Sequence, residues 1–138
     1  MNLVERGCPY IIVMHDLDDN QEAELRGAVQ ASLQNVGADI TVVLIPKHEI
    51  ESWLMFDAAA IAQAFRENVT IPLPAHPETV INPKEHLGGL IWTYYRKRYV
   101  NTLHNPQIAR KLDVAALNRS VSFAPHPPFV EQIKVQLP

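Results

Sequence analysis

Two short, almost wholly apolar runs constrain the fold of this chain most strongly. They are residues 9–14, "PYIIVM", and residues 38–46, "ADITVVLIP". Short apolar runs rich in β-branched residues are typical of strands that are covered on both faces, as in a parallel sheet. Between them, apolar residues recur at helical spacing: Ala23, Leu25, Ala28, Val29, Leu33 and Val36. With Asp19 or Asn20 as the helix cap and Gly37 as its stop, the sequence predicts a strand–helix–strand unit.

The rest of the chain is predicted to be mostly helical. Residues 48–65 carry an apolar helical stripe in which Asp57 can cap a break, and residues 68–83, with four prolines, are expected to be irregular. A further helix is expected to begin at Pro83 with Asn82 as its cap, followed by helices at 107–118 and 129–135. We therefore expect an α/β fold with a parallel sheet, flanking helices and a mostly helical C-terminal half, in a single domain spanning 1–138.

Charge and composition exclude several classes of protein. A formal net charge of −3 and a pI near 6.0 give no general nucleic-acid signature, so a polyanion would have to bind a local patch or a bridging metal. The single cysteine excludes an internal disulfide and fits a reducing compartment. No apolar run approaches the roughly 20 residues of a membrane span, and no secretory leader is visible. We expect a cytoplasmic protein that does not enter the membrane.

Acidic residues follow both apolar runs. Asp16 and Asp18 come after the first, and Glu49 and Glu51 come after the second. Ligands in open α/β sheets bind beyond the carboxyl ends of the strands, where the two clusters should converge. A hard divalent cation would relieve their repulsion, activate water and stabilise a phosphoryl transition state. From spacing alone, capping of the following helix and interaction with its dipole explain Asp18, Asp19 and Glu22 equally well.

Four segments carry a resemblance to a known superfamily: "VMHDLDDN", "IPKHEIESWLMFD", "INPKEHL" and "IARKLDVAALNRSVSFAPHPPFVEQIK". Together they resemble the TOPRIM-like nucleases, and most of all the small TOPRIM-like proteins of bacterial defence loci, which are often encoded beside an ATPase. The resemblance implies a Rossmann-like TOPRIM-type sheet and a Mg²⁺- or Mn²⁺-dependent phosphodiesterase acting on nucleic acid, with a role in phage defence. It makes Asp16 and Asp18 metal ligands, Glu51 a metal ligand or catalytic group, and Glu49 its support.

One departure from the TOPRIM pattern concerns the N-terminus. TOPRIM-like domains begin with an extra strand that ends in a glutamate, whereas here Glu5 is the only acid before the first run. We therefore expect a truncated or split domain, or a protein that no longer cuts. The exposed sheet edge should pair with another chain, giving a homo-oligomer or a complex with an ATPase partner. The alternative function is a non-catalytic interaction subunit of such a complex, and a third idea is a hydrolase of small phosphoesters.

One basic stretch, "YYRKRY", stands out in the C-terminal half. Arg96, Lys97 and Arg98 lie between tyrosines and can contact nucleic-acid phosphates. A solvated helix face is the competing interpretation. Trp53 is predicted to pack as core beneath the sheet rather than to stack on a base.

Overall fold

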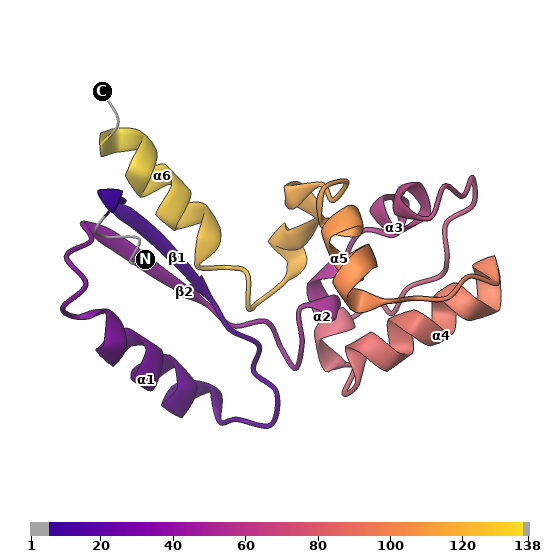
Figure 1. The fold of residues 1–138 in the computed structure, drawn as a ribbon, viewed down its shortest axis with the longest axis horizontal. Helices are drawn as coiled ribbons and strands as arrows, with labels where there is room; N and C mark the ends of the chain where they lie inside the picture. The colour runs from indigo at the N-terminus through magenta and orange to yellow at the C-terminus, as the bar shows by residue number, and fades with distance from the viewer. Residues whose placement is uncertain (1–5, 137–138) are drawn as a thin grey trace.

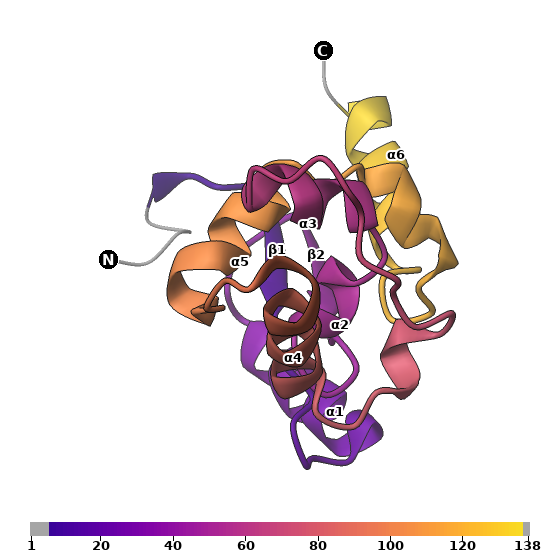
Figure 2. The ribbon, with the colours of Figure 1, turned by 90° about the vertical axis from the view of Figure 1, so that its right-hand side faces the viewer.

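A small parallel sheet organises the N-terminal half of the molecule. The computed structural model describes residues 6–136, and within them β1 (Tyr10–Met14) pairs with β2 (Ile40–Leu44) in a register that runs from Tyr10↔Ile40 to Met14↔Leu44. Helices α1 (Glu22–Leu33) and α6 (His126–Gln136) flank this sheet on opposite sides (Figures 1 and 2). The remaining elements are helical, and helices make up about half of the chain. The predicted mixed α/β class with a helical C-terminal half is confirmed.

β1 is less covered than the sequence predicts. Both flanking helices pack on β2, where Val43 and Leu44 are buried. On β1, by contrast, Ile12 and Met14 remain 48% and 54% exposed. The prediction that both strands are covered on both faces is therefore wrong for β1, because α6 lies over β2 and leaves its neighbour open. Within the described residues, β2 is also the only strand that pairs with β1.

Helix α1 begins later than its predicted cap. Its N-cap is Gln21, not Asp19 or Asn20, and no side chain caps the helix. Asn20 instead closes the preceding turn, since its side-chain amide donates to the Leu17 carbonyl oxygen at 3.0 Å. Arg26 ties the helix to the sheet through a 2.9 Å hydrogen bond from its guanidinium group to the Val43 carbonyl oxygen.

Four helices form the second half of the molecule around one apolar cluster. They are α2 (Glu51–Leu54), α3 (Ala58–Ala64), α4 (Pro83–Tyr95) and α5 (Asn101–Ala109), joined by 3-10 turns η2 (Pro77–Thr79) and η3 (Val114–Arg119). Asp57 caps α3 as predicted, because its Oδ1 accepts the Ala60 N–H at 2.9 Å. Pro83 at the first position of α4, after Asn82, is also confirmed. The proline-rich connection before α4 contains only the short turn η2.

Two helix boundaries differ from prediction at prolines. The expected helix at 107–118 is wrong: α5 spans Asn101–Ala109 with Pro106 inside it, and η3 follows as a separate turn. Pro106 gives up one backbone hydrogen bond but does not break the helix. The expected helix at 129–135 is α6, which begins at His126 because Pro127 and Pro128 fit its first turn. No helix within 6–136 is long and apolar enough to cross a membrane.

Helix α2 is anchored in two buried clusters. Leu54 and Met55 belong to the cluster of the four helices, whereas Trp53 and Phe56 belong to a second cluster with Leu44 of β2. Trp53 is 4% exposed and its indole N–H donates to the Ser122 hydroxyl at 2.7 Å, which confirms its predicted place in the core. Because α2 is fixed from both sides, its first residue, Glu51, occupies a rigid position.

Candidate active site at the carboxyl ends of the strands

The two acidic segments run side by side because strand-like pairing continues beyond the sheet. The Leu17 N–H donates to the Pro46 carbonyl oxygen at 3.1 Å, and the Asp18 N–H donates to the His48 carbonyl oxygen at 2.8 Å. The loop after β1 and the loop after β2 are therefore held together along several residues. The convergence expected from the parallel strands is present.

The backbone at this meeting point is strained. Asp18 and His48, which are hydrogen-bonded to each other, have φ values of 47° and 61°. Residues other than glycine rarely adopt this left-handed conformation, which costs on the order of 1 kcal/mol each and persists only where surrounding contacts enforce it. Asp and His adopt this region more often than most other residues, and Arg66 and Arg96, outside the site, also have positive φ.

Asp16 lies at the centre of a mutually repelling group of carboxylates. Its pKa is raised above the ordinary value by burial first and then by the negative charges of Asp18, Glu51 and Glu49. The backbone N–H of Ile50, which donates to the Asp16 carboxylate, opposes part of this rise. The four acidic residues singled out in the sequence are thus close enough to interact electrostatically.

Glu51 is buried and held on one oxygen only. It is 2% exposed, and its Oε1 accepts hydrogen bonds from the Tyr99 hydroxyl at 3.0 Å and from the Asn105 side-chain amide at 2.9 Å. Burial and the neighbouring Glu51 charge raise the pKa of Tyr99, which keeps its hydroxyl protonated as a donor. Within 6–136, Oε2 has no hydrogen-bond partner. Glu51 is therefore oriented with one oxygen left available.

Sequence reasoning did not find Tyr99 and Asn105. They lie 48 and 54 positions from Glu51, and no local spacing marks them as its partners. In the sequence, Tyr99 stands out only as the last residue of the basic stretch. A glycine allows its approach, since a Cβ on Gly88 would lie 3.3 Å from the Tyr99 ring.

Within residues 6–136, Glu49 is the one member of the group with a cationic partner. It accepts a hydrogen bond from the Lys84 backbone N–H at 3.1 Å and one from the Lys84 ammonium group at 3.4 Å. This ion pair raises the pKa of Lys84. No lysine or arginine in 6–136 forms an ion pair with Asp16, Asp18 or Glu51. The group keeps most of its negative charge unneutralised.

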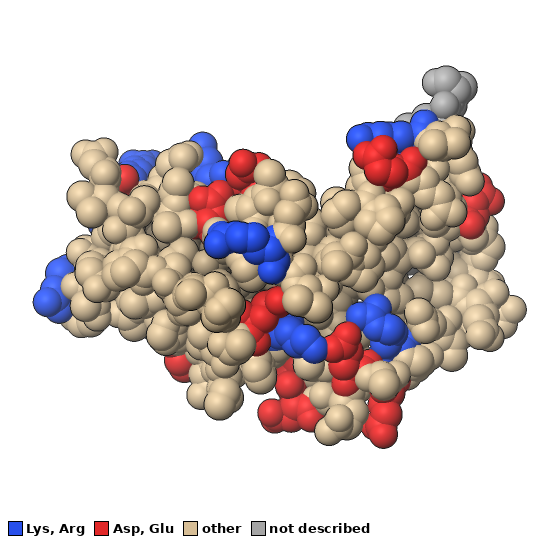
Figure 3. Space-filling model, turned by 180° about the vertical axis from the view of Figure 1, so that it is seen from behind, with Lys and Arg blue, Asp and Glu red and all other residues tan. Residues whose placement is uncertain are grey.

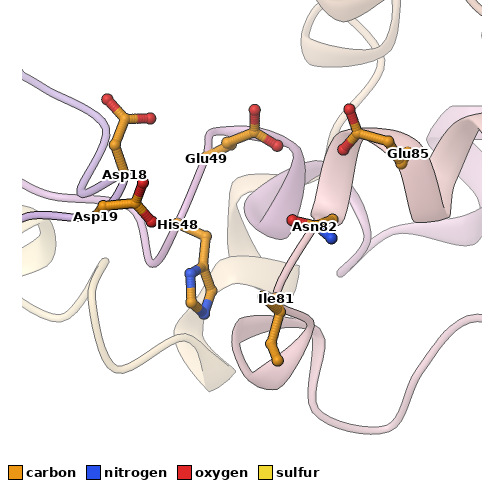
Figure 4. Close-up of a pocket in the computed structure, with 7 residues that line it drawn as sticks. All are labelled: Asp18, Asp19, His48, Glu49, Ile81, Asn82 and Glu85. Atoms are coloured by element: carbon orange, nitrogen blue, oxygen red, sulfur yellow. The ribbon is translucent and has the colours of Figure 1, made fainter.

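An acidic pocket of about 210 Å³ opens beside these residues (Figure 4). It is lined by Asp18, Asp19, His48, Glu49, Ile81, Asn82 and Glu85. The carboxylates of Asp18, Glu49 and Glu85 point to the same side (Figure 4). On the face opposite to Figure 1, acidic side chains gather in the lower part of the molecule, where the β1–α1 loop and α1 lie (Figure 3).

Helix capping does not explain Asp18 and Asp19. The N-cap of α1 is Gln21, and no side chain bonds to the free N–H groups at the start of that helix. The capping interpretation is therefore wrong for these two acids, whereas Glu22 does lie in the first turn of α1, where its charge favours the helix dipole. Glu22, in the first turn, is paired with Arg26 and Lys47, which lower its pKa.

The donor chemistry of the group fits a hard cation. Its side chains offer carboxylate oxygens, which Mg²⁺ and Mn²⁺ accept as ligands. As the side chains stand, no three His, Cys, Asp or Glu residues of the described chain enclose a position for an ion. Mg²⁺ retains several waters and binds proteins through one or two carboxylates, so a closed cage is not a condition for binding.

The other predicted candidates lie elsewhere. Arg96, Lys97 and Arg98 are exposed and follow α4. Lys97 donates to the Phe65 carbonyl oxygen at 2.6 Å and pairs with Glu67, whereas Arg96 and Arg98 have no side-chain partner within 6–136. Glu5 lies outside the described residues.

Comparison with known proteins assigns the chain to a family. No curated protein and no solved structure matches it significantly. A family model described as "Domain of unknown function (DUF4276)" matches residues 5–125. Since this match spans most of the chain, the protein belongs to the DUF4276 family.

Proposed function

We propose that the acidic group binds Mg²⁺ or Mn²⁺ and that the protein is a subunit that hydrolyses phosphodiester bonds. One observation carries this proposal: backbone hydrogen bonds hold the segment of Asp16 and Asp18 beside the segment of Glu49 and Glu51, at the carboxyl ends of the two strands. Clustered like charges reduce the stability of the unliganded fold, and a bound cation would relieve this repulsion. The resemblance of the surrounding segments to TOPRIM-like nucleases supports the same chemistry, with nucleic acid as substrate and phage defence as context.

Each acidic residue has a distinct proposed role. Asp16 and Asp18 would hold the metal, and the free Oε2 of Glu51 would position one of the waters that the ion retains. A bound divalent ion supplies an activated water and neutralises charge on a phosphoryl group. Tyr99 and Asn105 orient Glu51 through its Oε1, as groups behind metal ligands commonly do. Lys84 keeps Glu49 from adding a full negative charge.

A TOPRIM-type fold remains the finer proposal about architecture. It is supported by the chain order of a strand, Asp16 and Asp18, a helix, a second parallel strand, and then Glu49, Glu51 and Trp53. The two strands are adjacent and parallel, as that order requires.

Metal-dependent cleavage tests the proposed function. Purified protein is incubated with single-stranded DNA and RNA, with Mg²⁺, Mn²⁺ or EDTA, and its metal affinity is measured by calorimetry. We expect binding and cleavage to fall at least tenfold in Asp16→Asn. The matched control is Asp39→Asn, which removes the same charge from an exposed residue just before β2, at the opposite end of that strand. Equal activity and equal metal affinity in the two variants would exclude the proposal.

The second candidate function is a non-catalytic interaction subunit that docks on an ATPase or another copy of the chain. Its support is the open face of β1 at Ile12 and Met14. Met14 also lines an apolar groove of about 400 Å³ with Trp53 and Phe123. Metal affinity separates the two candidates, because an interaction subunit needs no divalent binding at millimolar concentration. Light scattering at high protein concentration tests the expected oligomer separately.

A further inference from the structure

A basic pocket lies between α3 and α5, apart from the acidic pocket and the apolar groove. It has a volume of about 430 Å³ and is lined by Gln63, Ala64, Arg66, Gln107, Arg110 and Lys111. The two helices pack against each other, as Figure 2 shows, and their C-terminal ends supply the lining. Three cationic side chains and two amides face one cavity, and no Asp or Glu lines it.

The cations of this pocket differ from most others in the molecule because they are not engaged. Arg26, Lys47, Lys84, Lys97, Arg119 and Lys134 all bond to a carboxylate, a carbonyl oxygen or both. Within 6–136, the side chains of Arg66, Arg110 and Lys111 have no hydrogen bond or ion pair. The two glutamine amides are likewise unbonded there. Free guanidinium, ammonium and amide donors around one cavity are the groups that bind phosphate oxygens.

The position of the pocket relates it to the acidic site. Asn105, which holds Glu51, and Arg110 belong to the same helical segment, and five residues of helix advance roughly 8 Å along its axis. A chain with a net charge of −3 and an acidic centre repels a polyanion, so it needs a local positive surface to hold one.

We propose that this pocket binds backbone phosphates of a nucleic-acid strand whose neighbouring phosphodiester reaches the acidic centre. The identification of the anion as nucleic acid rests on the proposed function. The positive charge of the pocket is an observation that does not depend on it. The competing explanation is that cations at helix C-termini only offset the helix dipoles. That explanation predicts an effect on stability and none on binding.

Fluorescence anisotropy with a labelled single-stranded oligonucleotide of about 20 nucleotides, in EDTA, tests the proposal. The variant Arg110→Gln/Lys111→Gln removes two pocket cations. Each lost phosphate contact lowers the slope of log K against log salt by about 0.7, so the slope should fall by about 1.4. At 50 mM salt this corresponds to an affinity loss of roughly tenfold or more.

The comparison variant is Arg96→Gln/Arg98→Gln, which removes two exposed cations of the basic stretch, the rival phosphate-contacting surface that the sequence predicted and that does not line the pocket. We expect its salt slope and affinity to stay within about twofold of wild type. Equal losses in the two double variants would overturn the proposal, because binding would then depend only on overall charge. A lower denaturation midpoint in Arg110→Gln/Lys111→Gln with unchanged binding would also overturn it, in favour of the dipole explanation.

Two further arms separate this proposal from the proposed function. Because EDTA removes divalent ions and Asp16→Asn removes a carboxylate that repels the strand, this variant should bind the oligonucleotide at least as tightly as wild type does. If the oligonucleotide still binds, but calorimetry and the cleavage assay with Mg²⁺ or Mn²⁺ show neither metal binding nor cleavage, the metal centre is excluded and the pocket proposal stands. If tripolyphosphate binds wild type but the oligonucleotide does not, the pocket is a free-phosphate site and the nucleic-acid assignment is wrong.

Discussion

Removing the charge of Glu78 should destabilise the fold more than removing any surface carboxylate. Glu78 joins the turn η2 to the segment that leads into α6. Its Oε1 accepts hydrogen bonds from the Ser120 hydroxyl at 2.8 Å, from the Ser122 backbone N–H at 3.1 Å and from the Ser122 hydroxyl. Its Oε2 accepts the Val121 N–H at 2.9 Å. Both serine hydroxyls therefore donate to this carboxylate.

The cost of Glu78→Gln follows from these contacts. The amide oxygen can replace Oε1, but the NH₂ group then faces the Val121 N–H, so one charge-assisted bond is lost and the others weaken. A hydrogen bond to a charged group contributes about 1.5–3 kcal/mol. Because Val121 is exposed, water can accept from its N–H and offset part of the lost bond. We expect the free energy of unfolding to fall by about 2 kcal/mol. With a denaturant slope near 2 kcal/mol per molar urea, the midpoint falls by about 1 M.

The pH dependence provides a second signature. Burial alone would raise the pKa of Glu78, but the hydrogen bonds from Ser122, Ser120 and the two backbone N–H groups outweigh it and lower the pKa. A carboxylate with a lowered native pKa contributes stability above its unfolded pKa, near 4.5, and loses it as the pH falls through the native value. The difference between wild type and Glu78→Gln should therefore be full at pH 7 and shrink progressively below pH 4.5.

Urea denaturation followed by circular dichroism measures both effects. The matched control is Glu131→Gln, which removes an exposed carboxylate paired only with Lys134 and should cost less than about 0.5 kcal/mol. If Glu78→Gln and Glu131→Gln lose equal stability at pH 7, the argument from the four hydrogen bonds is refuted.

Three further predictions concern the site. Gly89→Ala should stabilise α4 by about 1 kcal/mol, because nothing lies within 4 Å of the new Cβ. Gly88→Ala should stabilise the helix less or destabilise it, because its Cβ would lie 3.3 Å from the Tyr99 ring. Urea denaturation of the two variants measures the difference. In EDTA at pH 7, Asp16→Asn should be more stable than wild type: the raised native pKa means that ionised Asp16 reduces stability, increasingly as the pH rises past its unfolded value of 3.8. Mg²⁺ at ten times its dissociation constant should stabilise wild type by about 1.4 kcal/mol in a thermal melt and leave Asp16→Asn unchanged; an equal shift in both would place the ion elsewhere.

Local patterns predicted the elements whose formation depends on neighbouring residues. The two apolar runs became β1 and β2, the proline-rich segment stayed irregular, and Asp57 and Pro83 mark helix starts as expected. Convergence of the acidic segments was also predictable, because parallel strands end at the same edge of a sheet. The predicted bounds of the helix at 107–118 were wrong because of a proline. Pro106 lies within α5, although proline usually ends a helix.

The supporting contacts of the site were not predictable in the same way. Tertiary packing brings together residues that are far apart in the sequence, and no periodicity predicts it. The separations from their acidic partners are 48 positions for Tyr99, 54 for Asn105 and 35 for Lys84. The open face of β1 depends on where α6 docks, which is equally non-local. The sequence thus predicted the position of the acidic side chains but not the residues that orient them, Tyr99, Asn105 and Lys84.

Line broadening by Mn²⁺ in amide NMR spectra tests the central claim most directly, because a paramagnetic ion erases signals only near its binding site. At substoichiometric Mn²⁺, the amides of residues 15–18 and of residues 47–51 should broaden together, and both effects should disappear in Asp16→Asn but persist in Asp39→Asn. Broadening of one segment without the other, or equal broadening in the two variants, would contradict a shared cation site at the ends of β1 and β2.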